Sequence, residues 1–138
     1  MKKLIIAIVF ILFSGVAFGQ ALQKGGVVGY HEWTFKLNPG VTADQFLEIW
    51  DSKAVPVMKK AIPEHTPFLL KGISADNKDK YASIYYFNSF EDLRKYWNED
   101  GTPTEKGTAA MVSYGPLFEE LSKLGEFTYT AKDWIIIR

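Results

Sequence analysis

The clearest pattern along the chain is an alternation of apolar and polar residues over positions 28–37. One face of this segment carries Gly29, His31, Trp33, Phe35 and Leu37. A period of two is typical of a β-strand whose mostly apolar face points toward a core. The residues at 38–40, Asn-Pro-Gly, are turn formers, so the strand is predicted to end there.

A helix with a proline inside it is predicted after this turn. Thr42 and Gln45 have the spacing of a capping box, in which two side chains satisfy free backbone N–H groups at a helix start. Pro56 lies within the helical pattern and Pro63 closes it. Because a proline removes one backbone hydrogen bond and clashes with the preceding turn, we expect a kink or a break near residues 54–55. The pattern itself rests on apolar residues near a 3.6-residue period: Phe46, Leu47, Ile49, Trp50, Ala54, Val57, Met58 and Ala61.

The next part of the chain predicts a β-hairpin and a second helix. Residues 68–73 and 81–87 are strand-like, and the polar residues 75–80 would join them. Ser89 has the position of an N-cap, and acidic residues follow it in the first turn, where the helix dipole favours them. This helix is predicted to stop within residues 98–103.

The last part predicts further helix and a final strand. Residues 104–124 have a helical pattern that Gly115 and Pro116 interrupt, and residues 127–138 form a strand that bends near Lys132. The order of elements is then strand, helix, strand, strand, helix, strand. This order predicts an α+β fold of the ferredoxin-like, split βαβ type, with one four-stranded antiparallel sheet and helices on one face.

Residues 1–19 have the form of a cleavable secretory signal peptide. Two lysines follow the initiating methionine, an unbroken apolar run covers residues 4–13, and Ala17 and Gly19 are the small residues that a signal peptidase needs. Cleavage is expected before Gln20. The alternative is a retained membrane anchor, but a spanning helix needs roughly 18 or more apolar residues, more than this run supplies.

Export would leave residues 20–138 as one periplasmic or secreted domain, with no membrane contact after cleavage and with a flexible lead-in at 20–26. The whole chain has 16 basic and 16 acidic residues, so loss of the two leader lysines gives a net charge of −2. This balance gives no electrostatic basis for nucleic-acid binding. The chain has no cysteine, which excludes thiol catalysis, disulfides and a lipid-modified cysteine.

Three segments resemble a known superfamily. They are Tyr30-His31-Glu32-Trp33, the proline-containing helix at 54–60, and residues 85–93, where a strand runs directly into a capped helix. Together with the order of elements, they resemble the dimeric α+β barrel superfamily of ferredoxin-like domains, which includes antibiotic-biosynthesis-monooxygenase and NIPSNAP-like domains. The resemblance implies a homodimer whose two sheets face each other, with the helices outside. Such burial of both sheet faces would suit residues 81–87, which are apolar or aromatic on both faces.

His31 is the candidate acid–base group. It lies in the middle of the first strand, on the apolar face, where an imidazole can transfer protons within a pocket. Some members of the similar superfamily have a working histidine on this strand. The favoured alternative is a structural histidine that is buried and hydrogen-bonded. His65 is a candidate second polar group at the pocket entrance, against the favoured alternative of a solvated histidine beside a turn.

Aromatic residues are the candidates for substrate binding. A cavity between helices and sheet is the expected place for an apolar ligand, although plain core packing is favoured for each of these residues. The candidates, besides His65, are Trp33, Trp50, Tyr86, Trp97 and Met111. No metal or other cofactor is predicted, because His31 and His65, with Glu32 and Glu64 nearby, have no metal-ligand spacing, and no haem-attachment motif is present.

Two functions are compatible with these features. One is an exported domain that binds an apolar or aromatic small molecule without a required reaction, and it is slightly favoured. The other is a cofactor-independent enzyme of the monooxygenase, isomerase or cyclase type that uses His31 as acid or base. The superfamily contains such enzymes, haem enzymes and members without known activity, so the resemblance does not choose between the two.

Overall fold

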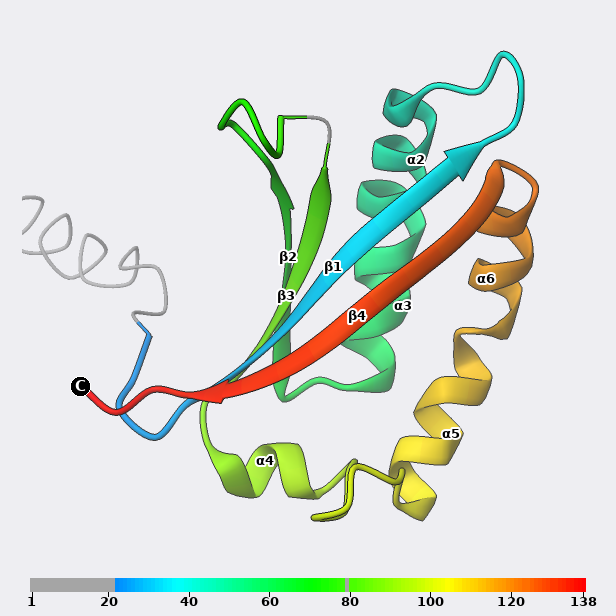
Figure 1. Cartoon of the computed structure of the whole chain (residues 1–138). Coiled ribbons are helices and arrows are strands. Elements are labelled where there is room, and N and C mark those ends of the chain that lie inside the picture. Colours follow the sequence, from blue (N-terminus) through cyan, green and yellow to red (C-terminus); the bar gives the residue numbers. More distant parts are fainter. Residues whose placement is uncertain (1–21, 79) are drawn as a thin grey trace, which may run out of the picture.

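The computed structural model describes residues 22–78 and 80–138 (Figure 1). The predicted signal peptide at residues 1–19 and its cleavage site lie outside the described residues. Within the described part, no helix is both long enough and apolar enough to cross a membrane.

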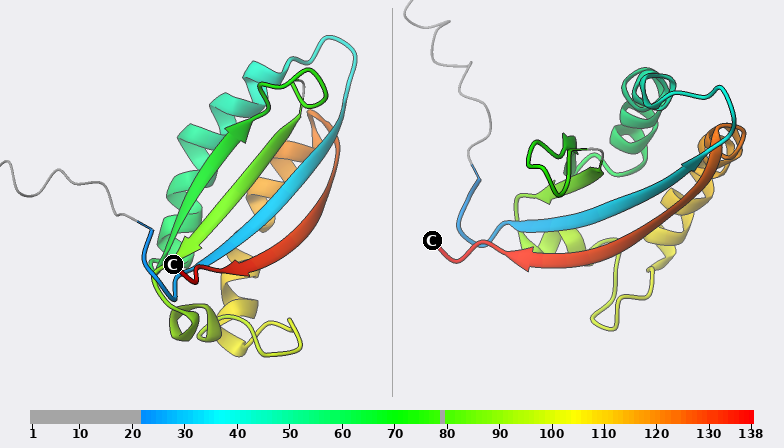
Figure 2. Two further views of the ribbon diagram at one scale, coloured as in Figure 1. Left: turned by 60° about the vertical axis from the view of Figure 1, so that its left-hand side comes forward. Right: turned by 45° about the horizontal axis from the view of Figure 1, so that its top comes forward.

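Four strands form one sheet: β1 (Val27–Leu37), β2 (His65–Lys71), β3 (Tyr81–Phe87) and β4 (Gly125–Ile135). Their order is β2-β3-β1-β4, and every neighbouring pair is antiparallel. The longer helices cover one face of this sheet (Figure 2). The predicted α+β fold with the split βαβ arrangement is therefore confirmed.

The first helical segment continues past its proline. Helices α2 (Ala43–Ile49) and α3 (Val55–Ala61) are joined by a π-helical turn, η2 (Trp50–Ala54). The Val55 N–H donates to the carbonyl of Trp50, five residues earlier, and this wider turn makes room for the Pro56 ring. The expected disturbance near residues 54–55 is thus a local widening. At the N-terminus, the Thr42 N–H donates to Gln45 Oε1 over 2.8 Å, which confirms the capping box.

The remaining helices are α4 (Phe90–Arg94), α5 (Glu105–Ser113) and α6 (Gly115–Ser122). Ser89 Oγ accepts a hydrogen bond from the Asp92 N–H at 3.1 Å, as its predicted role of N-cap requires. The predicted interruption near Gly115 is also confirmed, since α5 ends at Ser113 and α6 begins two residues later.

Strand register decides which side chains lie under the helices. His31 pairs with Ser83 on β3 and with Ala131 on β4, and His65 pairs with Phe87. Successive side chains of a strand point to opposite faces, so the odd-numbered residues of all four strands share one face. Trp33 packs against helix residues, so this is the face under the helices, and the even-numbered residues form the outer face.

The apolar core consists of two separate clusters of buried residues. The first contains Trp33, Phe46, Trp50, Ala54, Met58, Leu117 and Leu121. The second contains Val27, Ile62, Phe87, Tyr96 and Ala110. Half-buried Tyr85 and Tyr114 pack against both clusters. The boundary between the two clusters is therefore formed by side chains that carry hydroxyl groups.

The segment before β1 is bound to the sheet. The Gln23 N–H donates to the hydroxyl of Tyr86 over 2.9 Å, and the Gly25 N–H donates to the carbonyl of Ile136 over 2.7 Å. Gly26 packs so closely on Tyr86 that a Cβ there would lie 2.7 Å from the ring. The prediction of a flexible lead-in is therefore wrong for residues 23–26, because this segment covers an aromatic side chain of the outer face.

Candidate functional site

His31 lies half-buried in the middle of β1, on the face under the helices as predicted. Its ring meets the Tyr85 ring edge to face, with the centroids 4.8 Å apart. On the other side it lies parallel to the Tyr129 ring at 5.0 Å and an interplanar angle of 3°. The imidazole is thus held between two phenol rings from the neighbouring strands β3 and β4.

Gly29 keeps open the space between His31 and a carboxylate. A Cβ at this glycine would lie 3.1 Å from Asp133 Oδ1 and 3.8 Å from His31 Nε2. Asp133 pairs with Gly29 across β4 and β1, so the carboxylate and the imidazole approach the glycine from either side. A side chain at position 29 would enter the gap between the Asp133 carboxylate and the His31 imidazole.

Burial favours the uncharged forms of His31, Tyr85 and Tyr114 near neutral pH. Burial lowers the pKa of His31, and the charge of Asp133 partly opposes this shift. Burial raises the pKa of Tyr85 to about 12, with a smaller opposing effect from Ser83. Burial also raises the pKa of Tyr114. A neutral imidazole therefore lies among phenols that keep their protons, an arrangement of one base and several hydrogen-bond donors.

His65 is buried, with 4% of its surface exposed, so the favoured interpretation of a solvated histidine is wrong. The physical reason is that β2 begins at His65 and not at Phe68, which places this side chain under the end of α3. His65 Nδ1 lies 2.6 Å from the carbonyl oxygen of Ile62, and the ring lies 5.6 Å from the ring of Tyr85. The two histidines thus approach Tyr85 from the strands on either side of it.

We call His31, His65, Tyr85 and Tyr114 the tyrosine–histidine layer. Its members come from β1, β2, β3 and the junction of α5 with α6. Tyr85 and Tyr114 contact both apolar clusters, so the layer lies where the two clusters meet.

The other predicted binding residues are not brought together around this layer. Trp33 and Trp50 are core residues of the first cluster, and the Trp33 Nε1–H donates to Ser83 Oγ over 2.9 Å. Trp97 packs in the second cluster, against Phe87.

Two of the candidates for the cavity between helices and sheet lie elsewhere. Tyr86 lies on the outer face of the sheet, opposite Val28, so the prediction that it lines this cavity is wrong. Met111 is 52% exposed on α5 and does not line it either.

A groove lies between α3 and α5, beside the second apolar cluster. Its volume is about 400 Å³, and it is lined by Val57, Lys60, Ala61, Lys106, Ala109, Ala110 and Ser113. Ala110 belongs to the second apolar cluster, and Ala61, Tyr85 and Tyr114 pack against that cluster. The walls of the groove are therefore mostly apolar, with Lys60, Lys106 and Ser113 as their polar residues, and two of the lining residues pack in the same cluster as Tyr85 and Tyr114.

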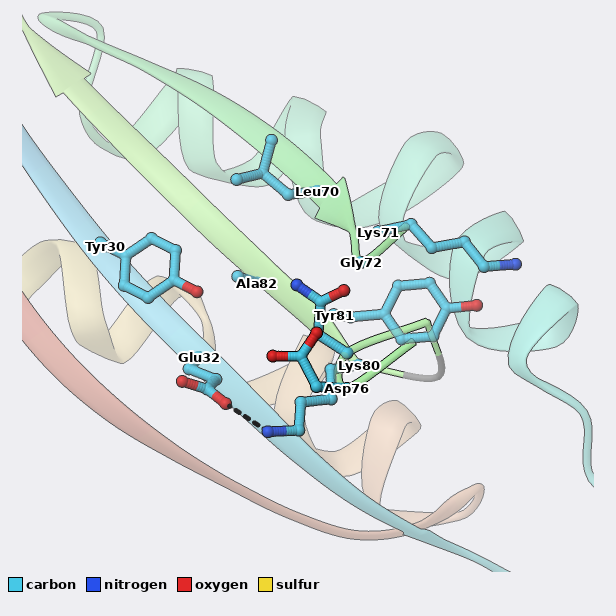
Figure 3. A pocket seen from close by; sticks show the side chains of 10 residues that line it. Tyr30, Glu32, Leu70, Lys71, Gly72, Asp76, Lys80, Tyr81 and Ala82 are labelled. Carbon is cyan, nitrogen blue, oxygen red and sulfur yellow. Dashed lines mark hydrogen bonds and ion pairs between the residues drawn. The ribbon is translucent and has the colours of Figure 1, made fainter. Parts of the chain in front are cut away.

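A second pocket, of about 320 Å³, lies on the outer face beneath the β2–β3 hairpin loop (Figure 3). Its floor is Ala82, which pairs with Leu70 on one side and Glu32 on the other. Glu32 and Lys80 form an ion pair of 3.4 Å at its rim. The pocket is mixed in charge and lies on the opposite face of the sheet from His31, so it does not belong to the same site.

No set of three or more histidine, cysteine or acidic residues is placed to hold a metal ion within residues 22–78 and 80–138. The arrangement described above can instead bind a small molecule through ring contacts and a few hydrogen bonds, and can accept or donate a proton at His31.

Sequence reasoning missed Tyr85, Tyr114, Tyr129 and Asp133. The sequence did contain a signal for Tyr85, because this residue lies on the same face of β3 as Ser83 and Phe87. That strand is apolar on both faces, so alternation alone did not show which of Tyr85 and Tyr86 lies under the helices. The positions of Tyr129 and Asp133 depend on the register between β1 and β4, which carries no local sequence signal.

No protein-family model and no sequence of a curated protein matches this chain. An uncharacterized NIPSNAP-like domain protein from Burkholderia xenovorans is similar in structure, with a TM-score of 0.55 at 8% identity, over 83% of this chain and 88% of that chain. SnoaB, a cofactor-independent oxygenase from Streptomyces nogalater, has a TM-score of 0.46 at 14% identity, over 78% and 91%. A dimeric ferredoxin-like protein of unknown function from Thermobifida fusca has a TM-score of 0.44 at 20% identity, over 86% of this chain and 100% of that chain.

These similarities concern the fold. The chain has the ferredoxin-like α+β fold that the resemblance implies. Identities of this size do not transfer an activity, so function has to be argued from the side chains.

Proposed function

We propose that this chain binds an apolar or aromatic small molecule in the groove between α3 and α5, against the tyrosine–histidine layer. The observation that carries this proposal is the division of the core. The phenol rings of Tyr85 and Tyr114 pack against both apolar clusters, and the second cluster also borders a groove of about 400 Å³. Ligand sites are typically apolar clefts with a few convergent polar groups, and this site has that composition.

The experiment uses 2-naphthol as the probe and isothermal titration calorimetry as the assay. Ala109 is exposed on the wall of the groove, so Ala109→Phe should fill the groove without disturbing the core. We expect this variant to weaken binding at least tenfold. The matched control is Thr108→Phe, at an exposed position of α5 that does not line the groove, which should bind as the wild type does. Binding that Ala109→Phe leaves unchanged, or no binding to the wild type, would contradict the proposal.

A second candidate function is favoured by the neutral state of His31. The lowered pKa of this histidine leaves an unprotonated base beside Asp133 and near phenols that keep their protons. Such a group can take a proton from an acidic C–H bond of a bound ligand and return one from solvent, which needs no cofactor. The site would then support a cofactor-independent enzyme of the isomerase, cyclase or monooxygenase type.

Deuterium exchange at C1 of 6-hydroxy-2-tetralone, a phenol that also has an acidic C–H bond, tests this second candidate. Base-catalysed exchange moves the carbon-bound proton to the imidazole and returns a deuteron from D₂O, so atoms and charge balance. NMR should show faster exchange with the wild type than with His31→Ala, while both proteins unfold at the same temperature. Equal exchange rates would leave binding as the only function supported.

Export is part of the proposal. Residues 1–19 would direct the chain out of the cytoplasm and be removed before Gln20. Expression of the full chain in a bacterial host and intact-mass measurement of the periplasmic fraction tests this. A mass for residues 20–138 is expected, and a full-length mass in the membrane fraction would favour the retained anchor.

We also propose a homodimer that joins two sheets by their outer faces. The even-numbered, outer side of the sheet exposes Phe68 at 46%, Leu70 at 39% and Trp134 at 61%. Large apolar side chains gathered on one face are typical of an interaction surface. Native mass spectrometry should give a dimer that Trp134→Glu dissociates. Ile73→Glu, in the hairpin loop and also highly exposed, is the control and should leave the dimer intact.

A further inference from the structure

His65 has a fixed tautomer. Its Nδ1 lies 2.6 Å from the carbonyl oxygen of Ile62, and a carbonyl oxygen only accepts hydrogen bonds. Nδ1 therefore carries the proton and donates, and in the neutral ring Nε2 is left as an acceptor. Burial lowers the pKa of His65, which favours this neutral ring.

Nε2 of His65 is buried and has no hydrogen-bond partner among the described residues. The side chain is 4% exposed, so bulk water does not reach this atom. Buried polar atoms in folded proteins are almost always paired, because an unpaired acceptor has lost its hydration without compensation. An unpaired acceptor therefore requires an explanation beyond packing.

The position of this atom connects it to the proposed site. The two nitrogens of an imidazole point in nearly opposite directions, so Nε2 faces away from Ile62 and the end of α3. The ring lies between those of Tyr85 and Phe87, at 5.6 and 5.7 Å, on the face of the sheet under the helices. Tyr85 also packs on His31, so the acceptor belongs to the layer against which the proposed ligand would lie.

We infer that His65 Nε2 accepts a hydrogen bond from a hydroxyl or N–H group of the bound molecule. The ligand class is then a phenol, an alcohol or a heteroaromatic N–H compound rather than a pure hydrocarbon, an ether or a ketone. This inference rests on the proposed function, because it names the ligand class of the same site. A site that hydrogen-bonds a ligand donor discriminates strongly against analogues that lack the donor, since the buried acceptor would then stay unpaired.

The test compares 2-naphthol with 2-methylnaphthalene, which replaces the donor by a methyl group on the same ring system. Affinities for both probes are measured with the wild type, His65→Leu and His65→Gln. The measured quantity is the ratio of the two affinities within each protein, so general losses of stability cancel. We expect the preference for 2-naphthol to fall at least tenfold in His65→Leu, which removes the acceptor. His65→Gln retains an acceptor oxygen and should keep most of the preference.

A second measurement does not depend on a variant. The ¹⁵N NMR spectrum of the wild-type histidines should show Nε2 of His65 unprotonated, and its resonance should move on addition of 2-naphthol and not of 2-methylnaphthalene. The inference is overturned if His65→Leu keeps the wild-type preference for 2-naphthol, or if Nε2 of His65 is protonated. In either case, binding of both probes by the wild type would leave the proposed function intact. If the wild type binds neither probe, the proposed function and the inference fail together.

Discussion

Tyr96 tests how much one side-chain hydrogen bond contributes to joining the segment after α4 to the start of β2. The side chain is fully buried, and its hydroxyl donates to Glu64 Oε2 over 2.5 Å. Glu64 also has Lys106 Nζ at 3.2 Å and Lys95 Nζ at 3.6 Å. Glu64 directly precedes β2, and Tyr96 follows α4, so Tyr96→Phe removes one hydrogen bond between segments far apart in the sequence.

The expected loss follows from the type of bond. Hydrogen bonds to a charged group contribute about 1.5–3 kcal/mol to stability. Glu64 keeps two ammonium partners in the variant, and its side chain is 24% exposed, so the value should lie at the lower end. We expect Tyr96→Phe to lower the free energy of unfolding at pH 7 by about 1.5–2 kcal/mol. For a domain of this size the unfolding temperature would fall by about 5–10 °C.

The loss should depend on pH in a defined direction. The hydrogen bond from Tyr96 is the largest cause that lowers the pKa of Glu64 from 4.5 to about 2. A carboxyl group with a lowered pKa in the folded state contributes stability that is complete above its unfolded pKa and is lost as the pH falls toward the folded pKa. In Tyr96→Phe the folded pKa of Glu64 moves back toward 4.5. The difference between the two proteins should therefore be complete above about pH 5.5 and shrink as the pH falls to 2.

Urea unfolding followed by tryptophan fluorescence measures these differences at pH 7 and pH 3. A double-mutant cycle with Glu64→Ala assigns the effect to the pair, because Tyr96→Phe should cost much less in that background, which has no side-chain acceptor. The reasoning is refuted if Tyr96→Phe is equally destabilising in the Glu64→Ala background. A loss of the same size at pH 7 and pH 3 would refute it as well.

Three further predictions concern the candidate site. Burial lowers the folded pKa of His65, so the free energy of unfolding of the wild type should be greatest above about pH 7 and should decline as the pH falls through 6.5. Urea unfolding should show a smaller decline for His65→Gln. Trp33→Phe removes the indole N–H that donates to fully buried Ser83 and should lower the free energy of unfolding by about 1–3 kcal/mol. An equal loss in a Ser83→Ala background would contradict the assignment of this effect to the hydrogen bond. Gly29→Ala should displace the Asp133 carboxylate, whose charge raises the pKa of His31, so NMR titration should give a lower His31 pKa in this variant. An unchanged His31 pKa would contradict this placement of the Asp133 carboxylate.

The elements of this fold were accessible from the sequence because their signals are local. The capping box at Thr42, the N-cap at Ser89 and the apolar run at 81–87 each lie within a few residues of the boundary that they predict. The start of β2 was placed three residues too late, since His65 and Thr66 have no apolar alternation that marks them as strand.

The site was less accessible because it depends on strand pairing. His31 was found on the correct face of its own strand, but its neighbours come from β3 and β4. A change of register by one residue moves every side chain of a strand to the other face, and the choice of Tyr86 in place of Tyr85 is an error of this kind. Sequence pattern gives the face only where one side of a strand is polar, and β3 has no such side.

The division of the core argues for a ligand more strongly than any single residue does. A domain of this size without disulfides depends on its apolar core, and the simplest way to fill the space between the two clusters would be with leucine, isoleucine or phenylalanine. The chain instead packs Tyr85 and Tyr114 against both clusters, with His31 and His65 beside Tyr85. Among the described residues it leaves one imidazole nitrogen, Nε2 of His65, without a hydrogen-bond partner. Each of these choices reduces the stability available from packing. Polar groups that are costly to the fold and lie together inside it are typical of a site retained for binding or catalysis.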